Sequence, residues 1–206
     1  MDNLFNAQLP VFQFIYKLVL TVLTGVLALI CALPLLTLGP SLTALYDTVQ
    51  KAIVQEQGSV LTTYFSSFRK NFRESFLCGL ILLGYLLIVG TGTCFCVILS
   101  RETGQQTLLQ YVVGALLLPA LLILPYLFPF ISRFVYTVRE YLIYSFYLSI
   151  RNLADTLLFA VLLYGSIFLV CVMPSIRVIA LALPGGICYL ISIRMEKIFE
   201  PLMKKA

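Results

Sequence analysis

Charged residues are absent from five long stretches of this chain, and their absence constrains the fold more than any other feature. The windows without Asp, Glu, Lys or Arg are 18–46, 75–100, 103–132, 156–176 and 178–193. About 20 apolar residues in a helix cross the roughly 30 Å hydrocarbon core of a bilayer. The first four windows exceed that length, and long charged side chains at the end of the fifth can reach the interface from within the membrane. The pattern predicts an all-α, polytopic membrane helix bundle.

The composition favours the same class over a soluble fold. Of the 206 residues, 61% are hydrophobic and 11% are charged, and the mean hydropathy is +1.01. A soluble domain carries about 25% charged residues, which cover its surface. The charges here cluster between the windows, and no stretch has the composition of a separate soluble domain. Residues 1–206 are therefore expected to form a single integral membrane domain.

Five transmembrane helices are expected, at about 18–38, 75–99, 107–131, 156–174 and 178–197. Because the last charge-free window is short, four spans with a re-entrant turn is the alternative count. Eleven of the fourteen Lys and Arg residues lie in the 39–74 connection, the 133–155 connection and the C-terminal tail. By the positive-inside rule, this distribution predicts a cytoplasmic C-terminus and an N-terminus outside.

The first window ends in a turn signal. Gly39 and Pro40 follow its apolar run, and a glycine just past a helix, followed by proline, is a common helix stop. We predict a structural elbow at these two residues, with Gly39 in the left-handed conformation. A second, amphipathic helix is expected over about 41–55, and Gly58 lies in the break that follows it.

An aromatic stripe backed by polar residues precedes the second expected span. The stripe has helical spacing and consists of Leu61, Phe65, Phe68, Phe72 and Phe76. The residues beside it form a candidate cytoplasmic contact face, which consists of Arg69, Lys70, Asn71 and Arg73. This pattern favours a helix lying in the membrane interface or, equally, a helix that packs its phenylalanines on the bundle. A second amphipathic cytoplasmic helix is expected within 133–155, between spans three and four.

Prolines and small residues predict irregularities within the spans. The 103–132 window contains three prolines, which predict a kinked or broken third span. The sequence Pro184-Gly185-Gly186 predicts an interruption of the last span. Such an interruption serves either packing or, as in some transporters, ligand binding. A stripe of small residues on the first span favours close helix packing, within the chain or in a homo-oligomer.

No catalytic, metal or cofactor motif occurs in the sequence. The chain has no His, and all six cysteines fall inside the charge-free windows, where cysteine usually packs as a small hydrophobic residue. The common hydrolase, zinc, P-loop and dinucleotide motifs are absent. The spans also lack the ionisable groups that coupling to a cation or proton requires. The net charge of +5 comes from juxtamembrane residues. We therefore expect a non-enzymatic protein with no cofactor, no metal and no nucleic-acid partner.

Three segments carry a family resemblance. Residues 33–46 have the sequence LPLLTLGPSLTALY, residues 64–75 have YFSSFRKNFRES, and residues 126–134 have YLFPFISRF, followed by NLADTLL at 152–158. In this order they resemble segments of the YesL-like family of bacterial integral membrane proteins. The element G-P-x-x-T-A is the most specific of these matches. Ala154 departs from the proline that members of that family often carry at this position.

The resemblance implies a location in the bacterial cell membrane and a link to carbohydrate uptake, since genes of that family commonly neighbour genes for carbohydrate uptake and degradation. It implies no catalytic residues. We therefore expect an accessory component of carbohydrate uptake, with the lipid bilayer and sugar transporter subunits as partners. The alternative is a small oligomeric transporter or channel.

Overall fold

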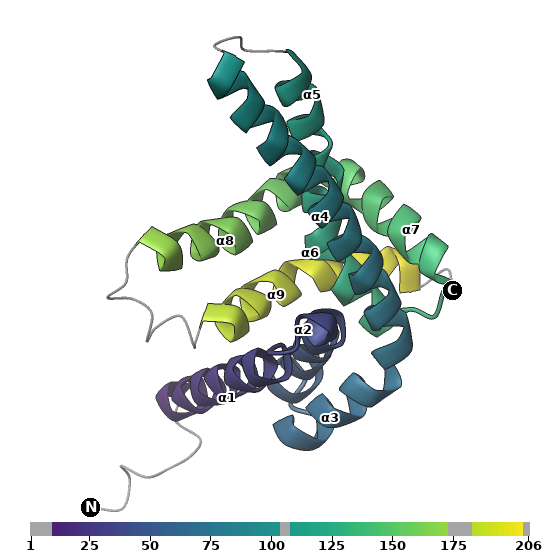
Figure 1. Cartoon of the computed structure of the whole chain (residues 1–206). Helices are drawn as coiled ribbons and strands as arrows, with labels where there is room; N and C mark the ends of the chain where they lie inside the picture. Colours follow the sequence, from purple (N-terminus) through teal and green to yellow (C-terminus); the bar gives the residue numbers. More distant parts are fainter. Residues whose placement is uncertain (1–9, 104–107, 173–182, 204–206) are drawn as a thin grey trace, which may run out of the picture.

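The computed structural model describes residues 10–103, 108–172 and 183–203. Within these ranges the chain is 91% helical and contains no strand, which confirms the all-α prediction (Figure 1). The elements in chain order are α1 (Pro10–Cys31), η1 (Leu35–Thr37), α2 (Leu38–Thr48), η2 (Val49–Val54), α3 (Val60–Lys70), α4 (Phe72–Thr103), α5 (Leu108–Ala115), α6 (Leu117–Arg133), α7 (Val138–Arg151), α8 (Leu153–Val172) and α9 (Leu183–Met203).

Two helical segments among the described residues are long and apolar enough to cross a membrane. They are Phe72–Arg101, with 30 residues, and Gln110–Arg133, with 24. α7 and α8 pass the same test as a pair, but they are bent by 104°, and they raise the count to three if they form one broken span. These apolar helices are those of a membrane-embedded protein, whereas the count of five spans stays a prediction. Residue 107 of the third expected span, residues 173–174 of the fourth and residues 178–182 of the fifth lie outside the described residues.

Polar residues set the starts of the two amphipathic helices outside the long spans. α3 begins after Ser59, whose hydroxyl accepts a hydrogen bond from the amide of Thr62 at 3.4 Å. α7 begins with a capping box, in which the Glu140 carboxylate accepts from the Thr137 amide at 2.8 Å. Such caps satisfy amides that a helix leaves unpaired in its first turn. Both predicted amphipathic segments are therefore helical and have defined starts.

α1 and the segment after it fold into a hairpin, which corrects the expected path of the first span. α1 ends at Cys31, and the chain returns along it: the Ser41 hydroxyl donates to the Ala28 carbonyl at 2.7 Å, and Lys17 Nζ lies 2.7 Å from Glu56 Oε1. The chain therefore reverses within the first charge-free window, and residues 18–38 do not form one continuous helix. The side of the membrane on which the N-terminal segment and the 39–74 connection lie stays a prediction. A hydropathy profile detects the apolar stretch, but it does not detect that the chain reverses its direction between α1 and α2.

α2 lies at the centre of the molecule, in contact with α1, α3, α4 and α6. One buried cluster joins α2 to α6, α8 and α9, and its fully buried aromatic side chains are Tyr46, Tyr126, Phe130, Phe159 and Phe199. A second cluster joins α2 and η2 to α1 and α3, around Ala28, Val49 and Tyr64. In Figure 1, α9 lies between α1 and α8 and contacts both.

The irregular positions serve packing. A side-chain carbon on Gly185 would overlap the main-chain carbonyl of Thr21, so this glycine lets α9 approach the backbone of α1. Gly185 lies in the first turn of α9, and the expected interruption of the last span is absent from the described part of that helix. The break in the third span falls at Leu116, between α5 and α6, and Pro125 and Pro129 lie within α6.

Candidate functional site

A buried group of ion pairs joins three helices that are distant in the sequence. We call Asp47 of α2, Arg133 at the end of α6 and Glu196 of α9 the ion-pair cluster. Arg133 Nε lies 2.8 Å from Glu196 Oε1, and Arg133 Nη1 lies 3.9 Å from Asp47 Oδ1. Their side chains are 12%, 22% and 3% exposed for Arg133, Glu196 and Asp47. Charges buried this deeply require partners of opposite charge. Here Arg133 is the partner of both Glu196 and Asp47.

Two further side chains complete the cluster. Lys51, one helical turn after Asp47, lies 2.8 Å from Asp47 Oδ2. The Tyr46 hydroxyl donates to Glu196 Oε1 at 3.2 Å, and the Arg133 guanidinium lies 6.0 Å from the centre of the Tyr46 ring. Burial and the nearby Glu196 charge raise the pKa of Tyr46 well above its ordinary value, so its phenol stays protonated. With two acids and two bases, the cluster is neutral as a whole.

The cluster still contains buried polar atoms without a hydrogen bond to the described part of the chain. These atoms are Asp47 Oδ1, Arg133 Nη2 and, nearby, Gln50 Oε1. Gln50 and Lys51 lie in η2, which is a π-helix. An unpaired buried polar atom costs about 1–3 kcal/mol, and π-helical turns are frequent at functional sites. These two irregularities coincide in the same part of the fold, which makes the cluster a candidate functional site.

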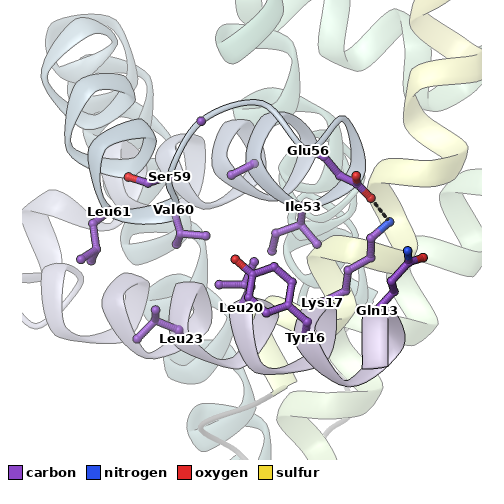
Figure 2. A pocket seen from close by; sticks show the side chains of 12 residues that line it. Gln13, Tyr16, Lys17, Leu20, Leu23, Ile53, Glu56, Ser59, Val60 and Leu61 are labelled. Atoms are coloured by element: carbon purple, nitrogen blue, oxygen red, sulfur yellow. Dashed lines mark ion pairs between the residues drawn. The ribbon is translucent and has the colours of Figure 1, made fainter. Parts of the chain in front are cut away.

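A cleft with a charged rim and a mostly apolar lining lies between α1 and the loop that follows η2 (Figure 2). Its volume is about 400 Å³. Figure 2 shows Lys17 and Glu56 pointing toward one another at its rim, with Leu20, Ile53 and Val60 along its wall. Glu56 has a φ of 56°, in the left-handed region that non-glycine residues avoid. The ion pair with Lys17 joins the loop to α1, and this contact offsets part of the cost of the strained backbone at Glu56.

The predicted contact face is exposed. Arg69, Lys70 and Arg73 are on the surface, and Asn71 is partly buried at the end of α3, where its amide donates to the Ser67 hydroxyl at 3.2 Å. None of the three basic residues has an ion-pair partner within the described ranges. The four residues share one corner of the molecule, where α3 meets α4, and they lie apart from the ion-pair cluster.

The aromatic stripe is largely exposed, although Phe68 packs against the buried cluster around Tyr64. Leu61, Phe65 and Phe72 are 50%, 51% and 38% exposed. The buried face of α3 instead contains Tyr64, whose hydroxyl lies 3.0 Å from that of Ser41 on α2. Neighbouring rings of the stripe contact one another along the chain: Phe68 and Phe72 are tilted, with centres 5.5 Å apart, and Phe72 and Phe76 are stacked, with centres 5.7 Å apart. The exposure of Leu61, Phe65 and Phe72 is consistent with the interfacial helix, whereas the contact of Phe68 with the buried cluster is the one expected of a helix packed on the bundle.

Gly39 and Pro40 lie inside α2, and the left-handed cap predicted for Gly39 is absent. The chain turns earlier, between Cys31 and Thr37, so the predicted elbow is several residues too late. A side-chain carbon on Gly39 would overlap the main-chain carbonyl oxygen of Ser75 on α4. Pro40 fits because the first turn of a helix needs no amide donor from it. Gly39 is thus a close-contact position between two helices.

One comparison with known proteins gives a match. Residues 14–92 match the model of a family described as "Protein of unknown function, DUF624". Neither the curated proteins nor the solved structures contain a significant match. The DUF624 segment contains α1 to α3 and most of α4, and it includes Asp47, Lys51 and the contact face. Arg133 and Glu196 lie beyond it, so the ion-pair cluster ties the DUF624 segment to the rest of the chain.

The sequence indicated none of the cluster's long-range contacts. Asp47 and Lys51 have the i, i+4 spacing of a helical ion pair, which is the one local signal. Arg133 and Glu196 lie at the edges of charge-free windows, where charged residues are usually solvated. Only the packing of α6 and α9 on α2 brings these four side chains together.

Proposed function

We propose that the protein is a non-enzymatic accessory component of a membrane transport system, and that it docks a partner through the contact face of α3. The exposure of that face carries the proposal. Arg69, Lys70 and Arg73 project from a helix whose opposite side is anchored on α2 by Tyr64. Basic side chains on such a fixed helix favour an acidic or anionic partner surface.

The partner class follows from the resemblance of residues 33–46, 64–75, 126–134 and 152–158 to the YesL-like family. That resemblance supports a bacterial cell-membrane location and a sugar transporter subunit as the partner. The DUF624 match overlaps the first two of these segments.

A cavity in the apolar part of the molecule also supports an accessory role over a carrier. It has a volume of about 420 Å³ and lies among α1, α2, α6, α8 and α9. Its lining is apolar except for Tyr46, Ser166 and Cys188. A path for a sugar requires many hydrogen-bonding groups, because each hydroxyl that leaves water unpaired costs free energy. This cavity offers few.

Copurification tests the proposal. The tagged protein and the triple variant Arg69→Gln, Lys70→Gln, Arg73→Gln are isolated in mild detergent, with Arg139→Gln on α7 as the matched exposed control. We expect the same transporter subunit, identified by mass spectrometry, to copurify with the wild type and with the control. We expect it not to copurify with the triple variant. A triple variant that inserts normally and keeps that subunit would show that these charges only orient the protein.

A second candidate function, a small oligomeric transporter or channel, is favoured by one observation. Tyr46 belongs both to the ion-pair cluster and to the lining of the apolar cavity, so a polar network with unpaired atoms borders that cavity. Solute flux into proteoliposomes and chemical cross-linking distinguish the two functions. Flux through the purified protein alone would favour the transporter.

We also propose that α3 and residue 17 share the cytoplasmic side. The basic connections support this side by the positive-inside rule, and the Lys17–Glu56 contact supports a common side for the two residues. Cysteines introduced at Gln13 and Gln57, in a background without native cysteines, are labelled with an impermeant reagent. We expect both to react from the same side, and Arg101→Cys, at the distant end of α4, from the other. Labelling of positions 13 and 57 from opposite sides would contradict the hairpin.

A further inference from the structure

A second cleft, with a largely polar lining, lies in the corner between α7 and α8, against the last turns of α9. Its volume is about 410 Å³. The polar residues that line it are Arg151, Asn152, Asp155, Arg194 and Lys197. α7 and α8 are bent by 104° at this corner, so the amino-terminal end of α8 lies at the cleft. This end of a helix carries partial positive charge.

The charges around this cleft do not cancel. Arg194 Nη1 lies 3.2 Å from Asp155 Oδ1, and Asp155 is the only acid among the described residues that line the cleft. Arg151 and Lys197 have no ion-pair partner among the described residues. The cleft thus keeps two uncompensated cations from two different helices. Cations gathered in a concave site, beside a helix amino terminus, favour an anion with several acceptor oxygens.

Apolar surface continues from the cleft along α8. Within the lining, Leu148, Ile198 and Leu202 provide apolar contacts. Leu153 and Leu157, in the first turns of α8, are 54% and 64% exposed. An apolar side chain on a long hydrophobic helix is exposed at little cost where lipid covers it. The corner therefore offers a basic site next to a surface suited to acyl chains.

We propose that this cleft binds the phosphate group of an anionic phospholipid, with Arg151 and Lys197 contacting the phosphate oxygens and the acyl chains following Leu153 and Leu157. Basic pockets between membrane helices hold lipid headgroups in this way. A soluble phosphate ester has the same headgroup chemistry but lacks the acyl chains. The site is distinct from the contact face of α3, and it does not depend on the accessory role.

Native mass spectrometry of the purified full-length protein tests the site. Phosphatidylglycerol is titrated against the wild type, Arg151→Gln/Lys197→Gln and Arg139→Gln, with phosphatidylcholine as the neutral lipid. Each cation near a phosphate contributes on the order of a five-fold change in affinity, so the double variant is expected to bind phosphatidylglycerol roughly 10- to 30-fold more weakly. Arg139→Gln, which removes one positive charge from the exposed first turn of α7, is expected to bind like the wild type.

A variant that is expected to tighten lipid binding distinguishes loss of the site from loss of folding. Asp155→Asn removes the one acid of the cleft and frees Arg194, and we expect several-fold tighter binding of phosphatidylglycerol. Wild-type protein that holds the two lipids equally, a double variant that binds like the wild type, or Arg139→Gln that loses as much as the double variant would overturn the site. The same would follow if Asp155→Asn weakened binding.

Soluble phosphate distinguishes the two sources of the ligand. Inorganic phosphate and glycerol 3-phosphate are added to the lipid-free protein, and bound lipid is challenged with each. We expect millimolar concentrations of either anion to displace little phosphatidylglycerol, because neither supplies acyl chains. Displacement at micromolar concentrations, lost in the double variant, would overturn the lipid assignment in favour of a soluble phosphate ester.

Discussion

Replacing Arg133 by Gln is expected to destabilise the fold more than any other single loss of charge in the ion-pair cluster. The change removes the bond of 2.8 Å to Glu196 and the weaker ion pair of 3.9 Å to Asp47. Removing one partner of a buried ion pair costs about 3–5 kcal/mol, because a charge is left buried without compensation. Asp47 keeps Lys51, and Glu196 keeps the Tyr46 hydroxyl. We therefore expect the lower end of that range, about 3 kcal/mol.

The assay is reversible unfolding in mixed micelles, compared for the wild type, Arg133→Gln and Lys51→Gln. Lys51 is the matched control, because its side chain is 39% exposed and its pair with Asp47 is screened by solvent. Its loss is expected to cost less than about 1 kcal/mol. The double variant Arg133→Gln/Glu196→Gln should cost less than the sum of its single variants, by about 1–3 kcal/mol, because the two residues share one bond.

The reasoning fails if Arg133→Gln costs no more than Lys51→Gln. It also fails if the effects of Arg133→Gln and Glu196→Gln are additive, because the two side chains would then not interact in the folded protein.

Three further substitutions test single contacts, each by thermal or chemical unfolding in detergent. Gly39→Ala should destabilise by about 1–3 kcal/mol, because the new carbon meets the α4 backbone, whereas Gly84→Ala, with open space around it, should be neutral or stabilising. Glu56→Gly should be more stable than Glu56→Ala by about 1 kcal/mol, because both lose the ion pair but only glycine adopts a φ of 56° without strain; equal stabilities would place the strain elsewhere. Tyr64→Phe should cost about 1 kcal/mol through loss of the bond to Ser41. Burial raises the pKa of Tyr64 above its ordinary value of 10.0, so wild-type stability should fall as the pH rises past 10.0, and this fall should be smaller in Tyr64→Phe.

Local patterns predicted the amphipathic elements well. The 41–55 helix is present as α2 and η2, and the aromatic-basic segment is α3. These segments depend on residues three or four positions apart, whose contacts a helix makes by itself. Local patterns could not decide which face of α3 is buried. The answer depends on Ser41, 23 residues before Tyr64, which holds that face against α2.

The prediction of the elbow failed for a similar reason. A glycine before a proline is typical of a helix stop, and the two residues instead begin a helix. What requires glycine at position 39 is the approach of α4 at Ser75, and no sequence pattern near residue 39 contains that information.

The sequence by itself determined the class of this protein. Long segments without charged residues are stable in the hydrocarbon core of a bilayer. Backbone amides and carbonyls in that core must be hydrogen-bonded to one another, and an α-helix pairs them within a single segment. The tertiary structure decided the path and the site. The hairpin that brings Lys17 to Glu56, and the cluster of Asp47, Arg133 and Glu196, arise from contacts between residues 39 to 86 positions apart. A buried charge is tolerated only when its partner arrives from elsewhere in the chain, so these residues have a shared role only in the folded molecule.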